Sequence, residues 1–295
     1  MTEHFDRGLE LVRQHQPVQA VVAFRAAADA GHAGAMSRIG QAYHSGEGVA
    51  RDGDEALRWF RRAAEGGDAH GMHAVGRALL LGDGTRRDAA AAFEWFERAA
   101  NSGHLRATFT LAWCFAHGSG VAQNLRTAAT WYRVAADAGY TDAMVSLALC
   151  YRSGRGVEPN AAAAVDWYRR AADANHARAM LLLGHCYKAG TGVESDAATA
   201  FKWFYRAAEH GDASAMTVVS QCFAAGDGVK QDAVASFLWR RCAAGASRAW
   251  SLASLNACDH GCVALDWYRR MVDGGRAVVE ESAEESVAVV DACPD

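Results

Sequence analysis

The sequence predicts an all-α protein of stacked helix-loop-helix repeats, and three observations support this prediction. A tryptophan recurs every 36 residues along the chain, from Trp59 to Trp239. A GxG segment recurs with the same spacing, first at Gly46 and last at Gly226. Alanine is abundant and the 295 residues include only 3 prolines, a composition that favours helix. Six repeats of equal length indicate a chain in which each repeat is stabilised by its neighbours.

Each repeat is predicted to form two helices, as its first copy illustrates. Between Met36 and Tyr43, apolar or small residues have the i, i+3, i+4, i+7 spacing of one helical face, which predicts a helix over 33–45. Apolar residues recur with helical spacing again over 53–65, which predicts the second helix. Each repeat is therefore expected to be a pair of amphipathic helices.

Polar residues and glycines mark the ends of the second helix. Asp or Asn precedes it, and such side chains accept from the unpaired backbone N–H groups of a helix start. In the first repeat, Asp52 and Glu55 also have the spacing of a capping box. Gly or Asn follows the helix, where a left-handed conformation is expected. The preceding residues are Asp52, Asp88, Asn124, Asn160, Asp196 and Asp232, and the following ones are Gly67, Gly103, Gly139, Asn175 and Gly211.

The GxG segments are interpreted as turns between the two helices of a repeat. A phosphate-binding loop would follow a strand, occur once and carry a longer Gly pattern or a Lys-Ser/Thr end. Here the segment occurs six times and is never followed by that lysine. The repeated tryptophans are likewise interpreted as core between repeats rather than as ligand platforms.

A 36-residue repeat with GxGV, then A-φ-x-W-[FY]-x-x-AA, then Gly resembles the Sel1-like repeat family, a relative of the tetratricopeptide repeats. The resemblance covers 33–247. Thr85 departs from it in place of the loop valine, and Arg240 in place of the aromatic residue after the tryptophan. The resemblance implies a right-handed α-solenoid that acts as an adaptor in protein complexes.

The ends of the chain are predicted to cap the six full repeats. Residues 1–32 keep the alanine and glycine spacing and form a degenerate N-terminal repeat. Residues 248–275 form a shortened C-terminal repeat, because Trp267 follows the preceding tryptophan by only 28 residues. Residues 276–295 are acidic and lack repeat features, so a disordered tail is expected there.

A protein or peptide partner is expected at positions that vary between repeats, since constant positions make the fold. Columns of varying residues begin at Gly34, Ser37, Gln41 and His44, and together they form one stripe along the first helices. In the related tetratricopeptide repeats this face lines the concave groove. Its central part is apolar and flanked by cations that suit carboxylates. The candidate groove residues are Arg77, Arg106, Phe109, Trp113, Val145, Leu149, Arg152, Arg178, Leu181, His185 and Lys188.

Two alternatives to a peptide groove remain open at this stage. The curvature of a solenoid can bury the apolar members of the stripe against neighbouring helices. The acidic tail, with Glu280 and Glu281, can occupy the groove in cis, although a solvated tail is the simpler interpretation.

The cysteines are expected to be free thiols. One column is shared by cysteine and by Ala42 and Ala78, which indicates a small buried slot. Equivalent helices lie about 8–10 Å apart, whereas a disulfide requires Cα atoms within about 7 Å. The CDHGC segment lacks a second ligand pair, so no zinc site is expected. The cysteines of the column are Cys114, Cys150, Cys186, Cys222 and Cys258.

No cofactor, metal or catalytic residue is expected. The histidines are interpreted as scattered over non-equivalent positions, and no catalytic spacing accompanies them. The net charge of −4 gives no footprint for nucleic acid. No apolar run approaches the ~20 residues of a membrane span, and no secretory signal is visible, so a cytoplasmic location is expected.

The expected function is that of a non-enzymatic scaffold or adaptor that binds a peptide or a partner helix on the concave face. A regulatory subunit that activates a partner enzyme is the first alternative. A β-lactam-binding hydrolase, like cysteine-rich relatives, is the second. It is disfavoured because those relatives place two cysteines in each repeat, and this chain does not.

Overall fold

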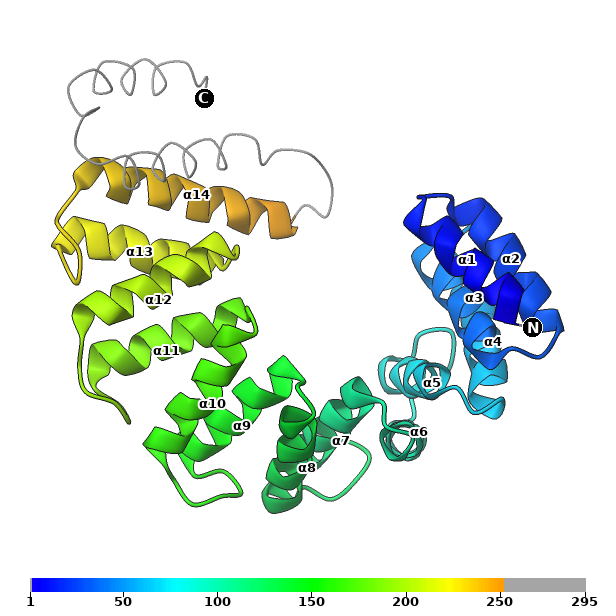
Figure 1. The fold of residues 1–295 in the computed structure, drawn as a ribbon. Helices are drawn as coiled ribbons and strands as arrows, with labels where there is room; N and C mark the ends of the chain where they lie inside the picture. The colour runs from blue at the N-terminus through cyan, green and yellow to red at the C-terminus, as the bar shows by residue number, and fades with distance from the viewer. Residues whose placement is uncertain (1, 252–295) are drawn as a thin grey trace, which may run out of the picture. The chain divides into compact units, whose positions relative to one another are not determined.

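The computed structural model describes residues 2–251, which form helices joined by short loops and contain no strand (Figure 1). All the helices of the full repeats before α14 contain 13 residues, as expected for equal repeats. The helices are α1 (Thr2–Arg13), α2 (Pro17–Asp29), α3 (Ala33–Ser45), α4 (Gly53–Glu65), α5 (Ala69–Leu81), α6 (Ala89–Asn101), α7 (Leu105–His117), α8 (Leu125–Asp137), α9 (Thr141–Ser153), α10 (Ala161–Asp173), α11 (Ala177–Ala189), α12 (Ala197–Glu209), α13 (Ala213–Ala225) and α14 (Ala233–Ser251).

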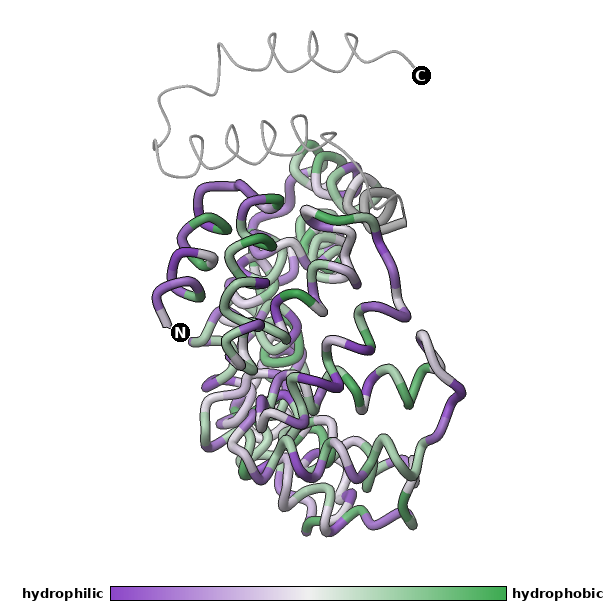
Figure 2. Tube along the Cα trace, turned by 90° about the vertical axis from the view of Figure 1, so that its right-hand side faces the viewer, coloured by the Kyte–Doolittle hydropathy of each residue, from purple (hydrophilic) through white to green (hydrophobic). Residues whose placement is uncertain are grey.

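In the N-terminal part of the chain each helix from α1 to α9 packs on the next one, and from α11 to α14 the same order is kept. Thus α3 packs on α4 within a repeat, and α4 packs on α5 of the following repeat. The predicted helices over 33–45 and 53–65 are confirmed as α3 and α4. Hydrophilic and hydrophobic residues alternate along the helices (Figure 2), as expected when each helix buries one face.

The chain divides into two compact parts, Met1–Trp167 and Tyr168–Asp295, here named the N-terminal body and the C-terminal body. In the N-terminal body, α1 and α2 form a hairpin that packs on α3. The division into capping and full repeats remains a prediction. At the C-terminal end, α14 continues through residue 247 to Ser251. The predicted acidic tail, most of the shortened repeat, Cys258 and the CDHGC segment lie outside the described residues.

The predicted N-caps of the second helices are confirmed, but the capping box is not. Asp52 accepts a hydrogen bond from the backbone N–H of Glu55 at 3.0 Å. The Glu55 carboxylate does not return the bond, because it accepts from Trp59 Nε1 at 3.0 Å and from Arg58 at 2.9 Å. The Asp52 N–H instead donates to the carbonyl of Tyr43 at 2.9 Å, which ties the start of α4 to the end of α3.

The GxG segments are turns, as predicted, and their second glycine also lies against the preceding repeat. Gly120 has φ +75°, and a Cβ placed there would lie 2.0 Å from the carbonyl oxygen of Ala89 at the start of α6. The same approach recurs for Gly156 and Gly228 against the first residues of α8 and α12. Glycine is therefore required at this position by contact between repeats as well as by the turn.

The side chain at the centre of each repeat is the aromatic residue after the tryptophan. Phe96 and Phe204 are fully buried, whereas Trp95 and Trp203 are only half-buried. An arginine one turn later covers the outer face of each indole, at 4.2 Å for Arg98 over Trp95. The prediction of core tryptophans is therefore correct for one face of the ring only.

The repeat that lacks this aromatic residue differs in which side chain is buried. Arg240 stands in its place, and here the tryptophan itself, Trp239, is 2% exposed. Its ring contacts Tyr205 with centroids 5.4 Å apart in an edge-on arrangement. The indole thus occupies the interior where the neighbouring aromatic side chain is missing.

The cysteine column consists of free thiols at its four described positions, as predicted. Cys114, Cys186 and Cys222 are buried, and Cys150 is partly buried. Burial raises the pKa of the Cys114 thiol to about 11, so it stays protonated and unreactive at neutral pH.

Within residues 2–251 no cluster of three or more His, Cys, Asp or Glu side chains is arranged to hold a metal ion. None of the described helices has the length and apolar character needed to cross a membrane.

Replacing Gly120 with alanine is expected to lower the free energy of unfolding by about 3 kcal/mol, since strain adds to a clash with backbone. The matched control is Gly103→Ala, because Gly103 has φ +80° with no other group within 4 Å of the added Cβ. That variant should lose only about 1 kcal/mol. Urea unfolding followed by circular dichroism measures both, and equal losses would contradict the contact between repeats.

Replacing Phe96 with alanine is expected to cost about 4 kcal/mol, because the ring is fully enclosed. Replacing Trp95 should cost about half as much, since one face of the indole is covered only by an arginine. Thermal unfolding of the two variants compares them directly. A larger loss of stability in Trp95→Ala than in Phe96→Ala would show that the tryptophan is the main core residue.

Candidate partner-binding surface

The N-cap positions of the first helices form a column that the sequence analysis missed. His32, His104 and His176 are spaced by two repeats, and each accepts through Nδ1 from a backbone N–H at 3.1–3.2 Å. Asp68 and Asp212 do the same with carboxylate oxygens at 2.7 and 2.8 Å. The interpretation of the histidines as scattered is therefore wrong for these three. The 36-residue spacing was the available signal.

The variable column that begins at Ser37 lies between repeats and contacts these caps. Three residues of the column, all in the N-terminal body, each meet the N-cap residue 31 positions later, at the start of the next first helix. The chemistry differs at each step: a hydrogen bond, then stacked imidazoles, then an aromatic pair. The pairs are Ser37 with Asp68, His73 with His104 (ring centroids 5.1 Å apart) and Phe109 with Tyr140 (5.4 Å).

Three of the candidate groove residues lie in this column: Phe109, which is half-buried, and Val145 and Leu181, which are buried. Val145 is 8% exposed and Leu181 is 4% exposed, so neither offers a surface to a partner. For these two, the alternative that neighbouring helices bury the stripe is correct. The physical reason is their place on the first helix, since the same position in the preceding repeats faces the next helix start.

The column that begins at Gln41 keeps contact with solvent. Arg77 and His185 are exposed, and Trp113 and Leu149 are half-buried. Trp113 packs one side against the cluster formed around Phe96 and stacks on His117 with ring centroids 4.5 Å apart. Its remaining surface is open. Phe109, one turn earlier on α7, is also half-buried.

The cationic candidates differ in how far they are engaged within the protein. Arg77, Arg106, Arg152 and Arg178 are exposed. Lys188 instead pairs with Asp227 of the next repeat at 2.5 Å, and this hydrogen bond raises the pKa of the lysine. His44 and Asp83 form the equivalent pair at 3.6 Å, also 39 positions apart. Lys188 is therefore part of a contact between repeats.

The candidates are divided between the two bodies. Arg178, Leu181, His185 and Lys188 belong to the C-terminal body, where the ring of His185 packs edge-on against Phe204 at 4.9 Å. The other candidates belong to the N-terminal body.

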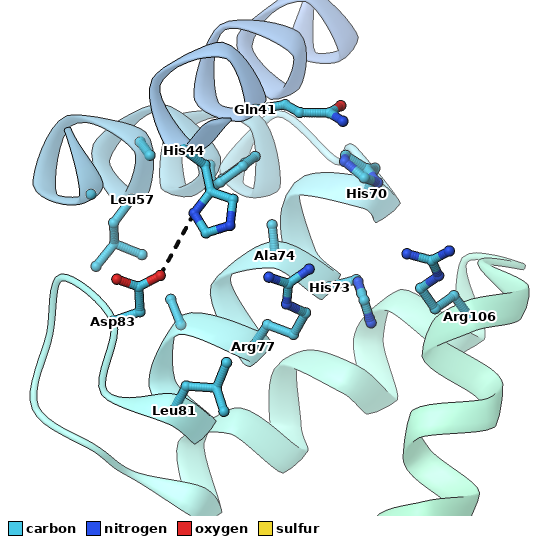
Figure 3. Close-up of a pocket in the computed structure, with 14 residues that line it drawn as sticks. Gln41, His44, Leu57, His70, His73, Ala74, Arg77, Leu81, Asp83 and Arg106 are labelled. Carbon is cyan, nitrogen blue, oxygen red and sulfur yellow. Dashed lines mark ion pairs between the residues drawn. The ribbon is translucent and has the colours of Figure 1, made fainter. Parts of the chain in front are cut away.

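A hollow of about 130 Å³ lies in the N-terminal body between the α3–α4 hairpin and α5 (Figure 3). Side chains of the stripe line one side of it: Gln41, His70, His73, Arg77 and Arg106. Apolar residues of α4 and α5, among them Leu57 and Leu81, line the other side. Of this lining the sequence analysis singled out only Arg77 and Arg106, because it favoured the more apolar central repeats.

The histidines beside this hollow are held neutral. Burial, together with His104 and Arg77, lowers the pKa of His73 to about 3. Loss of hydration also lowers the pKa of His70 and of His104, and Arg106 adds to both effects. Asp68 opposes the shift at His70 and His104 but does not cancel it. Burial is the largest cause of all three lowered pKa values, and the nearby arginines add to it.

Stacked helix pairs with a variable face on their first helices define an all-α repeat protein of the solenoid class. The chain belongs to the Sel1 repeat family, whose model matches residues 33–68, 69–104, 106–140, 141–176, 177–212 and 213–246. Proteins of this family generally mediate protein–protein interactions and are generally non-catalytic.

Solved structures show the same fold. A Sel1 repeat protein from Oxalobacter formigenes is 28% identical, with a TM-score of 0.73, over 81% of this chain and 96% of that one. The protein c5321 of uropathogenic Escherichia coli, a protective antigen with an SLR fold, is 28% identical with a TM-score of 0.70. That match covers 86% of this chain and 56% of the antigen. No curated protein matches the chain.

Acid is expected to destabilise the protein partly through His73. The unfolded chain binds a proton at this residue near pH 6.5, while the folded protein does so only near pH 3. The free energy of unfolding therefore falls as the pH falls between these values, by about 2 kcal/mol between pH 7 and pH 5 for this group.

The variant His73→Phe tests this, because phenylalanine occupies the equivalent position 109. Urea unfolding of both proteins at pH 7 and at pH 5 gives the comparison. The variant should gain about 2 kcal/mol relative to the original chain on acidification. A difference that does not change with pH would contradict the buried neutral imidazole.

Proposed function

We propose that the protein is a non-enzymatic adaptor that binds a peptide segment or helix of a partner on the first-helix face of its N-terminal body. The observation that carries this proposal is a half-exposed apolar group formed by Trp113 and Leu149, of the column that begins at Gln41, and by Phe109 one turn before Trp113 on α7. A partly open indole fixed by packing on one side is a common anchor at interfaces, because little conformational entropy is lost on binding.

Exposed arginines support the same proposal. Arg106 and Arg152 lie on the same stripe of the first helices and are exposed. Guanidinium groups at the rim of an apolar contact select partners with acidic residues and speed their association. An activating regulatory subunit would use the same contacts and differ only in the identity of the partner. The cytoplasmic location and the acidic tail as an occupant in cis remain predictions.

Replacing Trp113 with alanine is expected to weaken partner binding at least tenfold while the fold is kept, since loss of an aromatic anchor costs 2 kcal/mol or more. The probe is a phage-displayed library of random dodecapeptides selected on the full chain. Selected peptides are then measured against both proteins by fluorescence anisotropy.

The matched control is Trp95→Ala, which removes a half-buried indole from a second helix of the same body. This variant should bind selected peptides as the original chain does, with circular dichroism confirming its helices. Equal binding by Trp113→Ala, or equal weakening by both variants, would overturn the proposed surface.

A further inference from the structure

The hollow beside α5 has a cationic side and an apolar side. Asp83 is the only acidic residue among those that line it. Asp83 is already paired with His44, as the dashed line in Figure 3 shows. In Figure 3, Arg77 lies between that pair and His73, and His70 and Arg106 lie further from the pair. The lining therefore contains two guanidinium groups and one carboxylate, which leaves an excess of positive charge.

Arg77 is the arginine of the lining that lacks a partner among residues 2–251. It is exposed, and within the described part of the chain it forms neither a salt bridge nor a side-chain hydrogen bond. Burial is the main reason that the pKa values of His70 and His73 are lowered, and the charge of Arg77 contributes to both shifts. A negatively charged group of a ligand would complement this side of the hollow.

The other side of the hollow requires an apolar group on the ligand. Leu57, Phe60, Ala74, Ala78 and Leu81 present hydrocarbon to it. An apolar cavity of about 150 Å³ accommodates benzene, so a hollow of about 130 Å³ suits one aliphatic side chain. A nucleotide is too large for it, and an inorganic anion would leave the apolar side uncovered.

We propose that this hollow binds the C-terminal end of a polypeptide whose last residue is aliphatic. Such a residue carries its carboxylate and its apolar side chain on one carbon, so both sides of the hollow are satisfied by one group. Arg77 would pair with the carboxylate, for which the planar guanidinium is the suited donor. Arg106, which also forms a hydrogen bond to Tyr140, lines the same hollow. The aliphatic side chain of the ligand would lie against Leu57 and Leu81. This inference rests on the proposed function and names the chemistry of one part of the ligand.

Peptide pools test the proposal on the full chain. Each pool has five randomised positions followed by leucine, and one pool ends in a free carboxylate while the other ends in an amide. The free-carboxylate pool is expected to yield binders whose amidated forms bind at least tenfold more weakly. Arg77→Ala should abolish that preference. Arg126→Ala, an exposed arginine of α8 outside the hollow, should leave it unchanged.

Ala74→Leu provides a second variant that changes no charge. The added side chain fills the hollow and should weaken the same peptides, with circular dichroism confirming the fold. Equal binding of amidated peptides, or retention of the preference in Arg77→Ala, would overturn the proposal. Competition by N-acetyl-leucine at the affinity of the peptides would also overturn it, since a small carboxylate would then suffice.

The two variants Trp113→Ala and Arg77→Ala distinguish a failure of this proposal from a failure of the proposed function. Loss of binding in Trp113→Ala but not in Arg77→Ala would keep the adaptor surface and reject the C-terminal site. Loss in Arg77→Ala but not in Trp113→Ala would keep the C-terminal site and reject the apolar anchor.

Discussion

The structure depends on the contact that each repeat makes with the next one. A single pair of 13-residue helices cannot bury its apolar face, so it must be covered by a neighbour in a fixed register. Two features of the chain enforce that register. The second glycine of each loop lies against the start of the preceding second helix, as Gly120 lies against Ala89. The start of each first helix contacts the preceding first helix, as Asp68 contacts Ser37. The glycine contact recurs at Gly156 and Gly228, and the contact between first helices recurs at His73 and Phe109, because the repeats have the same length.

This dependence decides which variable positions are available to a partner. Variation between repeats does not by itself indicate recognition, since a pair of contacting residues can change together. His73 and His104 replace the Ser37–Asp68 hydrogen bond with stacked rings, and the contact is kept. Positions such as Arg77 and Trp113, which reach beyond the neighbouring repeat into solvent, are not constrained in this way. The proposed binding surface therefore consists mainly of the second kind of variable position, with Phe109 as a member that also contacts Tyr140.

Most of the fold could be predicted from the sequence, because its determinants are local. Helical spacing, the Asp52 N-cap and the turn glycines each act within a few residues of one another, and the 36-residue repeat multiplies every signal. What could not be predicted depends on distances between repeats. Burial of Val145 and the half-exposure of Trp95 follow from how neighbouring helices meet, and nothing in the local pattern encodes that. The hollow beside Arg77 was missed for the same reason: its lining comes from α3, α4, α5 and α7.

The position of His73 links binding in that hollow to the stacking of repeats. Its ring forms part of the wall and also lies against His104 and within 3.4 Å of Thr110 Oγ1 in the next repeat. A carboxylate near His73 favours its protonated form, while the stacked imidazole and the arginines oppose it. A ligand in the hollow would therefore act on the junction between the second and third repeats, in addition to its own contacts.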